Sequence, residues 1–229
     1  MGDGHRVFGP RQMVPLAGSF AVTSVCLFGS AGSFRWVNAW VFLALNLAAS
    51  VVASALLSNK PELLAERKNV KAGKGWDKPI VGFVVLVGPV ATWVTAGLDT
   101  RFRWSGSMAP ALFFAGIGIA CLSAGLLAWA MHSNRFFSAV VRIQKDRGHV
   151  VVTDGPYRFV RHPGYAGMLA FTLATPLILN SRWALAPAGI TAAVTVLRTA
   201  LEDRTLKKEL EGYADYAQTV RYRLAPPIW

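Results

Sequence analysis

The sequence predicts an all-α, polytopic integral membrane protein. About six transmembrane segments are expected, the last two forming a helical hairpin, followed by a cytoplasmic C-terminal helical segment. The 229 residues are 53% hydrophobic and 16% charged, with a mean hydropathy of +0.38. Several apolar runs approach the ~20 residues that a helix needs to cross a hydrocarbon layer of about 30 Å. Backbone polar groups in such runs are satisfied within the segment only if it is helical, so the composition excludes a soluble globular or disordered chain.

The apolar runs place the segments in order along the chain. The first four cover about 13–33, 36–58, 79–98 and 109–131, and a longer region covers about 165–200. The last region is long enough for two passes. Asn180, Ser181 and Arg182 lie in its middle and predict the tip of a hairpin, with Trp183 as an interfacial anchor.

The basic residues predict the orientation of these segments. The chain carries 24 Lys and Arg against 12 Asp and Glu, a net charge of +12. With the N-terminus in the cytoplasm, 20 of the 24 basic residues fall on the cytoplasmic side, and only Arg35, Arg101, Arg103 and Arg182 fall on the other. Positive charge accumulates in cytoplasmic loops and contacts anionic lipid headgroups. We therefore expect both termini and the active site to be cytoplasmic, with membrane lipids rather than nucleic acid as partners.

A functional boundary falls near residue 131. Residues 1–131 are predicted to be N-terminal transmembrane helices, and residues 132–229 a cofactor-binding, catalytic part. The four spans before this point are almost free of charge internally, and after it polar and ionisable residues crowd against the last hairpin. The loop QKDRGHVVVTDGPYRFVRHPGY runs from Gln144 to Tyr165 and contains the turn signal Asp-Gly-Pro. Pro163 can begin the next helix, whose first N–H groups are free to meet a ligand. The alternative is an interfacial basic loop without a ligand.

Two charged residues near the end of the last span form a second candidate. Arg198 and Glu202 are four residues apart and so share one helix face. Charges close to hydrocarbon are costly and are generally paired or functional. They form either a local ion pair or two separate sites, in which the arginine binds an anion and the carboxylate binds a cation. No metal site is expected, because the four histidines have no carboxylate or thiolate neighbours at ligand spacing.

Three strings carry a family resemblance. HVVVTDGPYRFVRHPGY, then RTALEDRTLKKEL and GYADY, resemble the isoprenylcysteine carboxyl methyltransferase family, within a wider group of phospholipid and isoprenylcysteine methyltransferase-like membrane proteins. The resemblance covers roughly 137–229. It implies S-adenosyl-L-methionine as cofactor, bound between the final helices and the C-terminal segment, and a lipophilic or lipidated acceptor. Asp203 departs from the family, which more usually has a second Glu there, and GYADY is compressed relative to the family pattern.

The resemblance also implies roles for individual residues. The cofactor-binding positions it implies are Gln144, His149, Val150, Val151, Val152, Tyr157, His162, Pro163, Gly164, Tyr165 and Glu202. Glu202 matches the carboxylate that binds the cofactor, and Arg198 matches the arginine that faces the substrate carboxyl group. Arg198 and Glu202 are thus the expected catalytic residues, and the arginine favours a carboxylate acceptor.

Two other functions remain open from the sequence. An NADPH-dependent membrane sterol-type reductase would share the RHPxY corner, but it should need more basic residues for the 2′-phosphate and a longer chain. A non-catalytic membrane scaffold or transporter would account for the apolar first half of the chain. It would not explain why the polar residues His149, Tyr157, His162, Arg198 and Glu202 all fall on the cytoplasmic side. Neither the identity of the acceptor nor the oligomeric state has a signal in the sequence.

Overall fold

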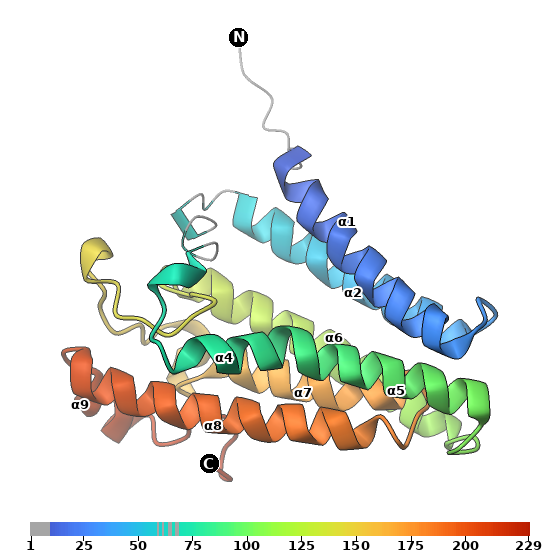
Figure 1. The fold of residues 1–229 in the computed structure, drawn as a ribbon. Helices are drawn as coiled ribbons and strands as arrows, with labels where there is room; N and C mark the ends of the chain where they lie inside the picture. Colours follow the sequence, from blue (N-terminus) through green and yellow to red (C-terminus); the bar gives the residue numbers. More distant parts are fainter. Residues whose placement is uncertain (1–9, 59, 61, 64–65, 67–68) are drawn as a thin grey trace.

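The computed structural model describes residues 10–58, 60, 62, 63, 66 and 69–229, and within them every regular element is helical (Figure 1). The α-helices are α1 (Pro10–Ser24), α2 (Val37–Ser58), α4 (Asp77–Gly82), α5 (Gly88–Phe102), α6 (Pro110–Ser133), α7 (Pro163–Ile178), α8 (Leu185–Glu209) and α9 (Tyr213–Thr219). Two π-helical segments, Val25–Gly29 and Phe83–Val87, continue α1 and join α4 to α5, and short 3₁₀ turns occur at Val70–Ala72, Lys145–Arg147 and Gly155–Arg158.

Three of the described helical runs are long and apolar enough to cross a membrane. They are Val37–Leu56, Asp77–Phe102 and Pro110–Ser133, and two shorter apolar helices cover Leu16–Gly29 and Pro163–Ile178. The predicted all-helical membrane architecture is therefore confirmed. The middle run is continuous through its π-helical segment, which ends two residues before Pro89. Proline lacks the N–H that an α-helix needs at this position, and its ring clashes with the carbonyl one turn earlier, so the wider turn accommodates it.

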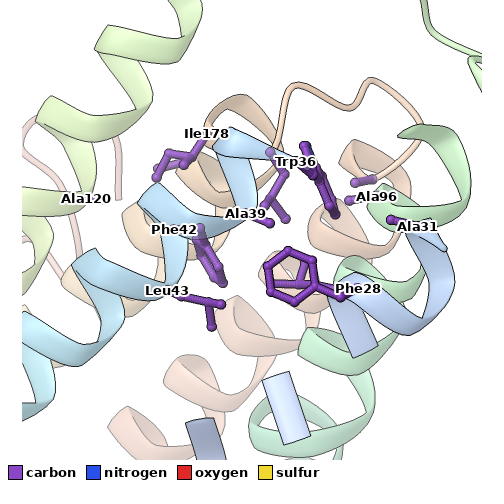
Figure 2. Packing of buried hydrophobic residues seen from close by; sticks show 13 residues of the cluster. Phe28, Ala31, Trp36, Ala39, Phe42, Leu43, Ala96, Ala120 and Ile178 are labelled. Carbon is purple, nitrogen blue, oxygen red and sulfur yellow. The ribbon is translucent and has the colours of Figure 1, made fainter. Parts of the chain in front are cut away.

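A buried apolar cluster holds the first two helices against the rest of the bundle (Figure 2). Phe42 and Leu43 of α2 pack there beside Phe28, which follows α1, and Ile178 at the end of α7. Asn38 adds a polar link, since its Nδ2 donates to the Ile178 carbonyl oxygen at 2.9 Å. Apolar packing and this hydrogen bond together fix the position of α2 relative to α7.

Small residues allow the closest helix contacts. Gly116 of α6 faces α7, and a Cβ added there would meet the Leu177 Cβ at 3.0 Å. Gly88 of α5 faces Thr191 of α8, with even less space for a Cβ. Close backbone approach is the usual way in which helices associate in membranes, where no hydrophobic force drives them together.

The connection between α7 and α8 is anchored by a buried carboxylate. Asp99 of α5 is 3% exposed and accepts hydrogen bonds from Ser181 Oγ at 2.5 Å and from the Ser105 backbone N–H at 2.8 Å. Asn180, which has a φ of +56°, accepts the Met108 N–H at 3.0 Å through Oδ1. These contacts tie the turn to the connection between α5 and α6.

The opposite end of the bundle contains the long connection 134–162 and the C-terminal segment. The backbone N–H of Arg161 donates to the Tyr222 carbonyl oxygen at 2.9 Å, and that of His162 donates to the Arg223 carbonyl oxygen at 2.9 Å. The chain that follows α9 therefore lies directly against the start of α7. Figure 1 shows this loop-rich end beside α9 and the beginning of α4.

Candidate active site

A cavity of about 310 Å³ opens at this end. Its walls come from α6, α7, α8, α9 and the connection 134–162, with contributions from α2 and the segment before α5. The cavity is lined by ten of the twelve residues that the sequence nominates: His149, Val150, Val151, Val152, Tyr157, His162, Gly164, Tyr165, Arg198 and Glu202. Tertiary folding thus brings residues 149–152, which we call the lip, to the same cavity as the polar face of α8.

Gln144 and Pro163 are the two nominated residues outside the lining. Gln144 is 1% exposed, and its Nε2 donates to the Phe136 carbonyl oxygen at 2.7 Å. Its Oε1 accepts from Arg147 Nη1 at 2.5 Å. These bonds use the side-chain amide within the loop itself, so direct cofactor contact by Gln144 does not fit this geometry. Pro163 occupies the first position of α7, where its missing N–H leaves no unpaired donor.

Glu202 lies in the lining with a polar partner from another helix. Tyr165 of α7 donates its hydroxyl to Glu202 Oε2 at 2.5 Å. Among the described residues, no hydrogen bond or ion pair reaches the other carboxylate oxygen, Oε1. A partly buried carboxylate with one open oxygen can bind a cation such as an ammonium group.

Arg198 is paired with an acid that the sequence did not nominate. Its Nε donates to Asp77 Oδ1 at 2.7 Å and its Nη2 to Asp77 Oδ2 at 3.0 Å. Both side chains are buried, with exposed fractions of 5% and 0%. In the part of the chain that the structure describes, no salt bridge joins Arg198 to Glu202. Of the two alternatives for this pair, the local ion pair is therefore wrong, because the buried carboxylate of Asp77 in α4 pairs with the guanidinium instead.

Asp203 is the centre of a second buried cluster. It is fully buried and accepts from Arg161 Nε at 2.8 Å and from Arg223 Nε at 3.0 Å. His162 Nε2 and the Tyr213 hydroxyl contact it at 3.3 and 3.1 Å. Arg161 and His162 are themselves buried. Arg161 and His162 therefore fasten the C-terminal segment to the start of α7.

The electrostatics of the lip keep His149 uncharged. Burial, with a smaller contribution from the positive charges of Arg142 and Arg147, lowers the pKa of His149 to about 4. Its Nδ1 accepts the backbone N–H of Gln144 at 3.2 Å, so the ring proton is assigned to Nε2. Burial likewise raises the pKa of the Tyr157 hydroxyl, which stays protonated. His149 and Tyr157 thus present neutral hydrogen-bonding groups to the cavity at physiological pH.

Comparison with known proteins agrees with this geometry. The sequence model of the isoprenylcysteine carboxyl methyltransferase family matches residues 116–208. The resemblance to this family is confirmed. Protein-S-isoprenylcysteine O-methyltransferase of Schizosaccharomyces pombe is 36% identical over 66 residues, covering 28% of each chain. Protein-S-isoprenylcysteine O-methyltransferase B of Arabidopsis thaliana is 32% identical over 90 residues, covering 38% of this chain and 46% of that one. The chain thus spans less than half the length of these curated relatives.

A solved structure shares the fold over nearly the whole chain. The eukaryotic intramembrane Ras methyltransferase, an isoprenylcysteine carboxyl methyltransferase, superimposes with a TM-score of 0.52 at 20% identity. The superposition covers 97% of this chain and 88% of that one. The shared fold therefore includes the helices that precede residue 116, where the family's sequence model does not match. Asp77 lies in this earlier part, and only its position as an acidic residue at the start of an apolar run could have drawn attention to it.

Proposed function

We propose that the protein is an integral membrane methyltransferase that transfers the methyl group of S-adenosyl-L-methionine to a carboxylate on a lipophilic or lipidated acceptor. One observation carries the proposal: Arg198 and Glu202, from one face of α8, line a single cavity with the lip, and no salt bridge joins these two side chains. A cation and an anion can therefore both bind at this site. The names of the curated relatives support an isoprenylated cysteine as the class of acceptor.

In this proposal residues 132–229 hold the cofactor. The open oxygen of Glu202 binds the ammonium group of the cofactor. The rest of the cofactor is surrounded by the lip valines, Gly164, His149, Tyr157, His162 and Tyr165. Gln144 and Pro163 act indirectly, through the fold of the loop and the start of α7. When bound, the cofactor supplies an electrophilic methyl group on a sulfonium sulfur.

The transfer needs position and exclusion of water more than acid–base help. A carboxylate acceptor arrives ionised, and Arg198 orients it. One carboxylate oxygen forms the new bond to the methyl carbon as the carbon–sulfur bond breaks, and the electron pair of that bond stays on sulfur. The two opposite charges are lost together, so no proton moves. Correct placement of two reactants can supply up to several kcal/mol of the barrier reduction. An amine acceptor would need a base and would gain nothing from a guanidinium.

Residues 1–131 supply the apolar side of the cavity. Ala53 of α2, Val85 before α5, and Leu127 and Met131 of α6 all line it. A hydrocarbon chain can lie against this wall while the water-soluble cofactor reaches the polar side. We further propose six membrane passes, with α7 and α8 as the final pair and with both termini and the site on the cytoplasmic side.

Calorimetry with S-adenosylhomocysteine, the demethylated product, tests the proposal. We expect the purified protein to bind it and Glu202→Gln to weaken binding at least tenfold. Glu209→Gln is the matched control: this residue lies on the same helix but is 42% exposed and paired with Lys74 at 2.7 Å. Equal binding by both variants, or a folded wild type that does not bind, would contradict the proposal. Titration with NADPH separates the reductase alternative, and neither ligand would bind a non-catalytic scaffold.

A further inference from the structure

Asp77 is a fully buried acid that belongs to the candidate site through its contacts. It is the first residue of α4, at the beginning of a candidate membrane span, and it lies outside the family match of residues 116–208. Besides the two bonds to Arg198, its Oδ2 accepts the backbone N–H of Val141 at 2.7 Å. Val141 lines the cavity. One carboxylate thus holds both the arginine and a segment of the cavity wall.

The geometry leaves Arg198 with one open nitrogen. Asp77 occupies Nε and Nη2, and Nη2 also donates to the Ala139 carbonyl oxygen at 2.8 Å. The guanidinium carbon lies 5.3 Å from the centre of the Tyr165 ring. Among the described residues, no hydrogen bond reaches Nη1. Because the guanidinium is planar and rigid, fixing one edge also fixes the direction of the remaining nitrogen.

We propose that Asp77 is a positioning residue that presents only Nη1 of Arg198 to the acceptor carboxylate. The inference rests on the proposed function and deepens it. A guanidinium with a free edge would grip both carboxylate oxygens as a fork. With that edge occupied by Asp77, the acceptor is held through one nitrogen, and one of its oxygens stays available to attack the methyl group. Asp77 also compensates the arginine's charge, which would otherwise be buried without a partner.

Replacing Asp77 by Asn tests the role. The amide keeps the size but loses the charge and one acceptor oxygen, so the guanidinium can turn. Turnover is measured as transfer of labelled methyl from S-adenosylmethionine to N-acetyl-S-farnesylcysteine and to the extractable lipids of the same membranes. We expect Asp77→Asn to lower kcat about 100-fold, the loss that a displacement of about 1 Å can cause. The Kd for S-adenosylhomocysteine should stay within threefold of wild type.

Asp99→Asn is the matched control. Asp99 is also a buried carboxylate of the same helical run, Asp77–Phe102, but it lies at the opposite end and contacts Ser105 and Ser181. We expect it to lower the unfolding temperature while kcat stays within threefold of wild type. If Asp77→Asn does not fold, Asp77→Glu keeps the charge and moves the carboxylate by one methylene, and kcat should still fall more than tenfold.

The outcomes separate the two proposals. The positioning role is overturned if either folded Asp77 variant keeps kcat within threefold of wild type, if cofactor affinity falls in parallel with kcat, or if Asp99→Asn loses as much kcat. A wild-type protein that does not bind S-adenosylhomocysteine, or binds it without transferring methyl to either acceptor, overturns the proposed function instead.

Discussion

The hydroxyl of Tyr165 donates to Glu202 Oε2 at 2.5 Å and joins the start of α7 to α8. The tyrosine ring also lies beneath the Arg198 guanidinium. Tyr165 therefore contacts both charged residues of the site, although no salt bridge joins these two side chains. Its position explains how two side chains one helical turn apart are held as separate binding groups.

Tyr165→Phe should weaken cofactor binding without abolishing it. The change removes the hydrogen bond to Glu202 but keeps the ring beneath Arg198. A hydrogen bond to a charged group contributes about 1.5–3 kcal/mol, so we expect the Kd for S-adenosylhomocysteine to rise about tenfold or more. Calorimetry measures this, and an unchanged Kd would show that Tyr165 does not orient the carboxylate.

Asp203→Asn should release the C-terminal segment. The substitution leaves Arg161 and Arg223 buried or half-buried without their shared acid. Removing one partner of a buried ion pair costs about 3–5 kcal/mol, so the unfolding temperature should fall sharply and protease should cleave after residue 209. Lys207→Ala is the control, because Lys207 contacts the same acid from a side chain 40% exposed and should matter little. Equal unfolding temperatures of both variants would show that the cluster around Asp203 does not hold the C-terminal segment in place.

His149 should make stability depend on pH in one window. Its pKa is about 4 in the folded protein and 6.5 for an ordinary histidine, so the unfolded chain binds more protons between these values. Stability should therefore rise with pH from about 4 to 6.5, and His149 should add no further pH dependence above that. Unfolding temperatures of wild type and His149→Gln across this range test the assignment. A slope that the substitution leaves unchanged would place the titration on another group.

Two glycines of α6 should respond differently to alanine. A Cβ at Gly116 would meet the Leu177 Cβ at 3.0 Å and the Ile178 backbone nitrogen at 3.1 Å, whereas a Cβ at Gly118 would meet nothing within 4 Å. Overpacking a tight contact costs about 1–3 kcal/mol. Gly116→Ala should lower the unfolding temperature, and Gly118→Ala should leave it unchanged or raise it. Equal effects would show that α6 and α7 are not closely packed at Gly116.

The helices and much of the candidate site could be predicted from the sequence. Runs of apolar residues admit only helices in a membrane, and Pro110 and Pro163 mark the starts of α6 and α7 because a proline in the first turn lacks only an N–H that would be unpaired anyway. The family resemblance nominated the lip, Arg198 and Glu202, and in the structure all of them line one cavity. These features depend on local sequence, so they are readable along the chain.

Only the tertiary structure decided which charges meet. The spacing of Arg198 and Glu202 indicates a shared helix face, but a buried guanidinium pairs with whichever carboxylate the packing brings to it, and Asp77 lies 121 residues away in the sequence. Asp203 likewise gathers partners from the connection before α7, from α9 and from the C-terminal segment. Gln144 is turned into its own loop by Arg147 and the Phe136 carbonyl. A buried charged side chain needs a partner of opposite charge, and this need can be recognised from the sequence. Which residue becomes the partner depends on the packing of segments that are far apart in the chain. The pairing of Arg198 with Asp77 therefore leaves no local sequence pattern.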